Sequence, residues 1–97
     1  MALFIKKISL SPEATIWKLE GRLAGDSVRT VMKELDARGG TSGLFLDLGG
    51  VVFVDEAGLD LLRQHTLVID AIIDCQEYVR ALLRENGLQS LLAPKVG

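Results

Sequence analysis

The hydrophobic period of this chain changes repeatedly between the strand type and the helix type. In Thr15–Leu23, apolar residues alternate with charged ones, as in a strand with one buried face. Directly afterwards Val28, Val31, Met32 and Leu35 recur at the spacing of a single helix face. A chain patterned in this way is limited to folds in which strands and helices follow one another.

The same pattern continues to the end of the chain. The stretch Gly43–Gly50 is almost continuously apolar, which predicts a central strand covered on both faces. A helix is expected over Gly58–Asp70, with Thr66 and Ile69 on its apolar face, although Leu67–Ile69 could belong to the next strand. A first strand is expected at Leu3–Ser11, a fourth strand at Ala71–Cys75 and a last helix at Glu77–Gly87.

These elements predict a small α/β domain of order β-β-α-β-α-β-α. The short connection Ser11–Ala14 predicts a hairpin between the first two strands. Later strands are separated by helices, so they are expected to pair in parallel with right-handed crossovers. The result is one mixed sheet with helices packed against it, and the 97 residues suit a single domain spanning 1–97.

Residues of the capping type mark the expected helix ends. Asp26 or Ser27 is expected to cap the first helix, and Gly39-Gly40 to end it. Gly87 is expected to end the last helix, with Leu88 making the accompanying apolar contact. The residues after Leu88 are expected to pack against the domain and then fray.

Charge and hydropathy exclude several classes of protein. The formal net charge of -2 argues against a nucleic-acid binder, which usually presents a basic face. No apolar run approaches the roughly 20 residues that a bilayer span requires, and the first residues do not resemble a signal peptide. We therefore expect a cytoplasmic protein.

The stretch Val52–Leu62 joins an apolar strand to an apolar helix through two adjacent acids. Asp55 can cap the helix, and Glu56 in its first turn favours the positive end of the helix dipole. Gly58 could admit the backbone of a partner or relieve crowding within the domain. Catalysis is disfavoured, because neighbouring side chains diverge and form a poor acid–base pair.

Four other residues could be read as functional, and for each a structural role is favoured. His65 is expected on a half-exposed helix face, since no second histidine accompanies it to bind zinc. Cys75 is expected to be buried. Trp17 is expected in the core, with an interface anchor as the alternative. Asp47 is expected to bond a loop backbone at the end of its strand.

The junction and its surroundings resemble a known family. "LFLDLGGVVFVDEAGLDLL" is similar to the signature of the STAS domain (sulfate transporter and anti-sigma factor antagonist). "WKLEGRLAGDSV" and "CQEYVRALLRENGL" are similar to its second strand with the following helix start, and to its last helix. The resemblance covers nearly the whole chain and implies a mixed sheet with packed helices.

The resemblance also implies a function. Anti-sigma factor antagonists of this family are non-enzymatic and bind a kinase-like anti-sigma factor, which phosphorylates a Ser or Thr directly after the junction Asp. Here that position is Glu56, and no Ser or Thr occurs from Gly43 to His65. The partner-binding residues carried over from the family are Asp55, Glu56, Ala57, Gly58 and Leu59.

Two functions follow from the resemblance and remain open at this point. The first is a bacterial regulatory module of the antagonist type, whose phosphorylation site is replaced by Glu56. The second is an accessory subunit that binds the cytoplasmic ATPase of a lipid-transport ABC system. An enzyme is disfavoured because no nucleophile–base pair, metal-ligand cluster or cofactor loop is recognisable. Exposed sheet edges leave homodimer formation open.

Overall fold

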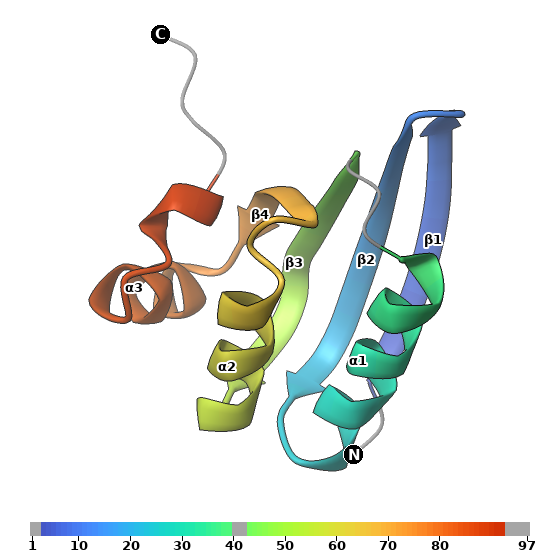
Figure 1. Cartoon of the computed structure of the whole chain (residues 1–97). Coiled ribbons are helices and arrows are strands. Elements are labelled where there is room, and N and C mark those ends of the chain that lie inside the picture. The colour runs from blue at the N-terminus through green and yellow to red at the C-terminus, as the bar shows by residue number, and fades with distance from the viewer. Residues whose placement is uncertain (1–2, 40–42, 93–97) are drawn as a thin grey trace, which may run out of the picture.

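The computed structural model describes residues 3–39 and 43–92. Within them the chain forms four strands and three α-helices in the predicted order, followed by a short 3-10 turn (Figure 1). The strands are β1 (Phe4–Ser11), β2 (Ala14–Leu23), β3 (Leu44–Val54) and β4 (Ile69–Cys75). The helices are α1 (Asp26–Arg38), α2 (Glu56–Gln64) and α3 (Glu77–Glu85), and the turn is η1 (Gln89–Leu91).

The strands form one mixed sheet in the order β1-β2-β3-β4. β1 and β2 pair antiparallel as a hairpin, whereas β2 with β3 and β3 with β4 pair in parallel. This confirms the expected mixed sheet and the two parallel crossovers. The carboxyl ends of β2 and β3 therefore lie at the same edge, next to the start of α1 and the start of α2 (Figure 1).

The core lies between the sheet and the helices. Alternate residues of β2 and β3 are buried there, among them Trp17, Leu19, Leu46 and Leu48. The opposite face of the sheet has no helix over it in the described part of the chain (Figure 1). The expectation that the third strand is covered on both faces is therefore wrong: Asp47 is only partly buried, as are its outward neighbours.

β3 is also longer than expected, because the apolar run Val51–Val54 continues it to the junction. The pairing of β2 with β3 shifts register twice, once opposite Asp47–Gly50 and once opposite Val51–Phe53. Such bulges change which residues face inwards. In Val51–Val54 the two end residues are buried, whereas Val52 is exposed although it too is apolar, so the run is continuously apolar while one face of the strand is open.

The second helix ends earlier than the apolar pattern predicts. α2 stops at Gln64, and Thr66 lies in the turn that follows. Ile69 begins β4, where it pairs with Leu44. Ile69 has helical spacing and is buried, but it is buried as a strand residue.

The helix ends are partly as predicted. Gly25, and neither Asp26 nor Ser27, is the N-cap residue of α1, so that expectation is wrong. The Ser27 hydroxyl instead accepts from the Ala24 amide at 3.1 Å and tightens the preceding loop. Gly39 ends α1 with a φ of 80°, as expected; Gly40 lies outside the described residues.

The end of α3 has the predicted Schellman geometry. The Leu88 amide donates to the Leu83 carbonyl at 2.8 Å, and the Gly87 amide donates to the Arg84 carbonyl at 3.2 Å. Leu88 is buried, and Leu92 forms a bridge with Ile72 at the β4 edge. The first part of the tail therefore packs as expected, whereas residues 93–97 lie outside the described part of the chain. None of the described helices is both long and apolar enough to cross a membrane.

Candidate functional site

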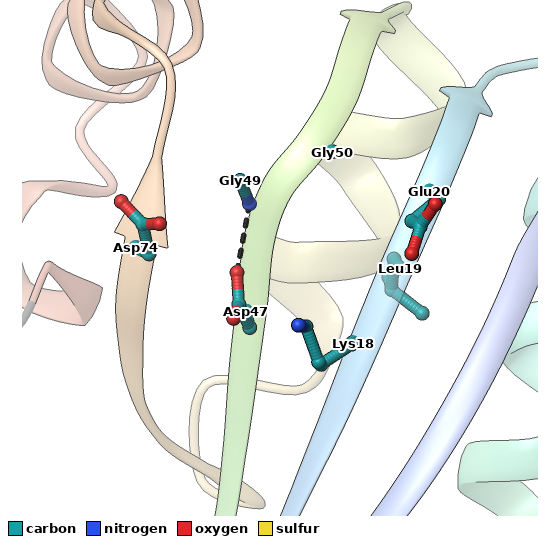
Figure 2. Close-up of a pocket in the computed structure, with 7 residues that line it drawn as sticks. All are labelled: Lys18, Leu19, Glu20, Asp47, Gly49, Gly50 and Asp74. Carbon is teal, nitrogen blue, oxygen red and sulfur yellow. Dashed lines mark hydrogen bonds between the residues drawn. The ribbon is translucent and has the colours of Figure 1, made fainter.

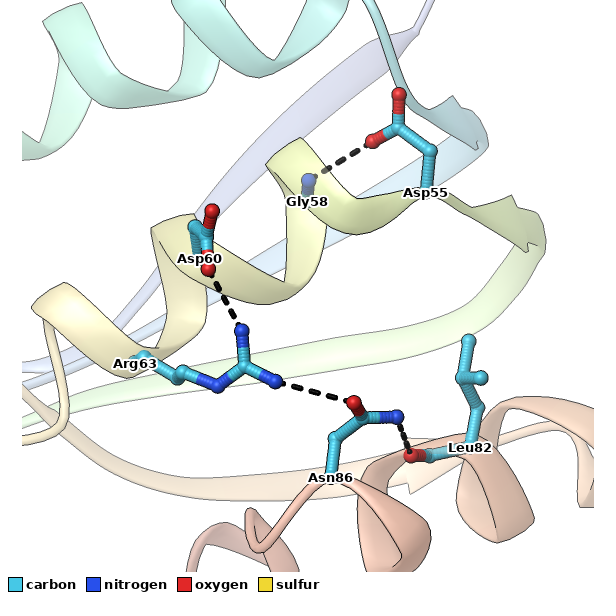
Figure 3. Close-up of polar contacts among 6 residues, drawn as sticks. All are labelled: Asp55, Gly58, Asp60, Arg63, Leu82 and Asn86. Carbon is cyan, nitrogen blue, oxygen red and sulfur yellow. Dashed lines mark hydrogen bonds and ion pairs between the residues drawn. The ribbon is translucent and has the colours of Figure 1, made fainter.

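Asp55 links the two segments that meet at the carboxyl edge of β2 and β3. Its Oδ1 accepts a hydrogen bond from the Gly58 amide at 2.8 Å, which is the N-cap bond of α2 (Figure 3). Its Oδ2 accepts from the Gly25 amide at 3.0 Å, in the loop that precedes α1. The Asp55 amide in turn donates to the Leu23 carbonyl at 3.3 Å. One carboxylate thus fixes the starts of two helices relative to each other.

Gly58 provides the close approach of α2 to β2. A Cβ atom built at Gly58 would lie 2.5 Å from the Leu23 carbonyl oxygen and 2.8 Å from Cγ1 of Val54. The space is therefore filled by the domain itself, and of the two roles considered for Gly58, relief of internal crowding is the one that the geometry supports.

The remaining predicted binding residues divide between the surface and the core. Glu56 and Ala57 are exposed in the first turn of α2, and Asp55 is partly exposed. Leu59 is only 2% exposed and packs in the core. The accessible part of the junction is therefore the tip formed by Asp55, Glu56 and Ala57.

The exposed side of α2 continues this surface. Asp60 accepts a hydrogen bond from Arg63 at 2.6 Å, one turn along the helix (Figure 3). Arg63 also donates to Oδ1 of Asn86 at 3.0 Å, and the Asn86 amide group donates to the Leu82 carbonyl at 2.8 Å. These contacts connect α2 to the end of α3 and so fix the position of α2 relative to α3.

One pair beside the junction was missed by the sequence analysis. The Arg22 guanidinium stacks over the Phe53 ring, 4.5 Å from its centroid. The two residues are register neighbours at the ends of β2 and β3. Sequence reasoning places Arg22 on a polar strand face, but the contact depends on a register that only the folded sheet shows.

Glu56 has no hydrogen bond or ion pair within residues 3–39 and 43–92. It stands at the positive end of α2, where a negative charge is favourable by about 0.3–1 kcal/mol. Its carboxylate is therefore compatible with the helix start and is free to meet another molecule.

Replacing Asp55 by Ala is expected to lower the free energy of unfolding by about 1–2 kcal/mol. The change removes the N-cap bond, which is typically worth about 1 kcal/mol, and leaves the Gly25 amide without its acceptor. Asn caps helices about as well as Asp, so Asp55→Asn serves as the matched control and should lose less. Urea titration followed by circular dichroism gives both values, and equal losses would contradict the capping role.

The other singled-out residues have structural positions. Trp17 is 3% exposed in the core, with Nζ of Lys7 4.9 Å from its ring centroid. Asp47 accepts from the Gly49 amide at 2.9 Å, a backbone bond as expected, but within β3 and not at its end. Cys75 is buried as expected, and burial raises the pKa of its thiol.

His65 is less exposed than predicted. It is the C-cap residue directly after α2, and its side chain is 14% exposed. Its Nδ1 lies 2.7 Å from the Leu61 carbonyl oxygen. Because a carbonyl can only accept, this nitrogen carries the proton. His65 therefore stabilises the helix end.

A hollow of about 210 Å³ lies on the opposite face of the sheet (Figure 2). It is lined by Lys18, Leu19, Glu20, Asp47, Gly49, Gly50 and Asp74. Its lining is largely charged, and the glycines leave room at the bulge of β3. No group of three His, Cys, Asp or Glu side chains in the described residues lies close enough to hold a metal ion.

Comparison with known proteins identifies the fold. No family model matches the sequence, and no curated protein matches it either. Among solved structures, the chain is similar to the anti-sigma factor antagonist SpoIIAA in its unphosphorylated form, with a TM-score of 0.75 and 16% identity over 95% of this chain and 90% of that one. It is also similar to a DUF3478-family protein with a SpoIIAA-like fold from Shewanella loihica PV-4, with a TM-score of 0.57 and 15% identity over 88% of this chain and 77% of that one. The chain therefore has the STAS-like fold of SpoIIAA, which the motif at its junction indicates.

Proposed function

We propose that this chain is a non-enzymatic regulatory module of the anti-sigma factor antagonist type that binds a protein partner in the cytoplasm. Its likeness to SpoIIAA over nearly the whole length supports this reading. The single observation that carries it is the tip of α2, where Glu56 and Ala57 are exposed on a helix start that Asp55 holds rigid. A rigid exposed surface binds with a low cost of ordering.

The proposed binding surface, here called the junction surface, comprises Asp55, Glu56, Ala57 and Asp60. Gly58 and Leu59 act beneath it: Gly58 lets α2 approach β2, and Leu59 anchors the helix in the core. Three of the four surface residues are acidic, which favours a partner with a basic or amide-rich contact area.

No hydrolytic or group-transfer chemistry is assigned to this surface. Both carboxylate oxygens of Asp55 already accept backbone amides, so they are poorly placed to take a proton from a substrate. Glu56 has no neighbouring base or nucleophile bonded to it within the described residues. The arrangement suits recognition of a partner.

Glu56 also defines how the proposed interaction would be regulated. It occupies the position that the family uses for phosphorylation, yet a carboxylate cannot accept a phosphoryl group to form a stable phosphoserine-like switch. It carries a single negative charge, compared with about -1.5 to -2 and three acceptor oxygens for a phosphoserine. Binding at this surface is therefore proposed to be independent of phosphorylation at position 56.

The experiment is a quantitative pull-down of the full chain, tagged at its C-terminus, from its native cells. Ala57→Arg should reduce recovery of the partner at least about tenfold, because a bulky cation at the centre of an interface typically costs about 1.4 kcal/mol or more. Ala81→Arg, at an exposed alanine on α3, is the matched control and should recover the partner like the wild type. Bound proteins are identified by mass spectrometry.

Recovery of a kinase-like anti-sigma factor that Ala57→Arg alone removes would support the proposal. If the wild type instead recovers an ABC transporter ATPase and Ala57→Arg alone loses it, the junction surface is still the binding site, but the chain is an accessory subunit of a transporter and not an antagonist. Equal loss with both variants, or with neither, would reject the junction surface as the binding site.

A further inference from the structure

A row of four charged residues crosses the open face of the sheet. The register places Lys6 beside Lys18, Lys18 beside Asp47, and Asp47 beside Asp74. Each strand contributes one residue, so the row has two cations at the β1 side and two anions at the β4 side. This set of Lys6, Lys18, Asp47 and Asp74 is here called the charged row.

The charges of this row are largely unsatisfied within the chain. In the described residues, the ion pairs involve Lys7, Arg63 and His65 and none of the charged row. Asp47 accepts one backbone amide, from Gly49. Figure 2 shows Lys18, Asp47 and Asp74 projecting from neighbouring strands around the hollow, with the helices behind the sheet.

An apolar row lies next to it on the same face. Ile8 pairs with Ile16, Ile16 with Phe45, and Phe45 with Ala71, again one residue from each strand. The first three are partly exposed, and this face has no helix over it in the described residues. Phe4, at the end of β1 beyond Lys6, is 69% exposed. The open face thus combines apolar surface with a charged row whose two cations lie towards β1 and whose two anions lie towards β4.

Whatever covers this face must neutralise the charged row, because charges buried without partners are strongly destabilising. A second copy of the chain does so when it is related by a two-fold axis that runs along the strands, midway between β2 and β3. This rotation reverses the strand order and keeps the position along the strands. Lys6 then faces Asp74 of the second copy, and Lys18 faces its Asp47. The apolar row faces the apolar row.

The alternative two-fold axis, perpendicular to the strands, places each strand opposite itself. When that axis passes through the charged row, Lys6 opposes Lys6 and Asp74 opposes Asp74. Like charges placed directly opposite each other are costly. The order of charges in the row therefore selects one of the two orientations.

We infer that the open sheet face is a self-complementary interface through which two copies of this chain associate. Two sheets packed face to face lie about 10 Å apart, a gap that a lysine and an aspartate side chain can bridge together. Four strands about 4.8 Å apart give a face of roughly 400 Å² per copy. Interfaces of this size associate weakly and reversibly. The proposed dimer interface is separate from the junction surface, so an experiment can reject either proposal without rejecting the other.

The test is sedimentation equilibrium of the full chain over a range of concentrations. The wild type should show a reversible monomer–dimer equilibrium. Lys6→Glu and Asp74→Lys should each weaken it at least about tenfold, since two attractive contacts per dimer become repulsive. Circular dichroism checks that both variants keep the fold. An equimolar mixture of the two should regain the wild-type affinity, because the glutamate introduced in one copy then faces the lysine introduced in the other.

Matched controls change the same charges elsewhere. Arg29→Glu on α1 and Glu85→Lys on α3 lie at exposed helix positions and should leave dimerisation unchanged. A wild type that stays monomeric at every concentration would overturn the inference and leave the face to a different kind of partner. So would a mixture that associates no better than either variant, or controls that weaken the dimer equally.

Discussion

Replacing Gly58 by Ala is expected to lower the free energy of unfolding by about 2 kcal/mol, although Ala is the better helix former. Helix propensity alone predicts a gain of up to about 1 kcal/mol in α2. The added Cβ, however, would lie 2.5 Å from the Leu23 carbonyl oxygen and 2.8 Å from Val54. The first neighbour is backbone, so α2 must move away from β2. Overpacking of this kind typically costs about 1–3 kcal/mol, and here it also strains the Asp55–Gly58 bond.

The neighbouring residue supplies the matched control. Ala57 is exposed in the same turn, so Ala57→Gly reports helix propensity without any change of packing. It should cost about 0.5–1 kcal/mol. Urea denaturation of the three proteins separates the two effects. A Gly58→Ala protein that is as stable as the wild type would show that α2 can shift freely, and that the close approach does not hold the junction.

The order of the elements could be predicted because it depends on local periodicity. Alternation identified β2, and a single helical stripe identified α1, without any knowledge of contacts. The error on β3 arose because Phe45, which lies on the open face between the buried Leu44 and Leu46, is itself apolar, so the stretch appeared continuously apolar. The apolar residues of the run Leu44–Val54 therefore fall on both faces, and only one face is covered by helices. The sequence of a strand alone does not show whether helices cover one face of its sheet or both.

The same distinction applies to the junction. The N-cap bond of Asp55 spans three residues and follows from residue type and spacing. Its second bond, to Gly25, joins positions 30 apart and exists only because β2 and β3 end side by side. The charged row likewise requires three strand registers at once. Contacts that depend on strand pairing could therefore not be predicted from the sequence, whereas a contact within one helical turn, such as the N-cap bond, could.

Replacing Gly43 by Ala is expected to have the larger effect on stability, a loss of about 3–4 kcal/mol that combines backbone strain with overpacking. Gly43 has a φ of 89°, where an L-residue costs roughly 1–2 kcal/mol. Its Cβ would also overlap the backbone carbonyl of Glu13, which cannot rotate away as a side chain can. Relief requires the start of β3 to separate from β2. That movement breaks the bond from the Thr15 amide to the Gly43 carbonyl, now 2.8 Å long.

Gly87→Ala isolates the conformational part of this loss. Gly87 has a φ of 74°, close to that of Gly43, but apart from its two chain neighbours no residue has an atom within 4 Å of the position that a Cβ would occupy there. It should therefore lose only about 1 kcal/mol. If both variants unfold with the same m-value, the difference between their urea midpoints measures the free-energy cost of the overlap with Glu13. If the two losses were equal, positive φ would account for both, and the contact between the β1–β2 turn and the start of β3 would not constrain the sheet.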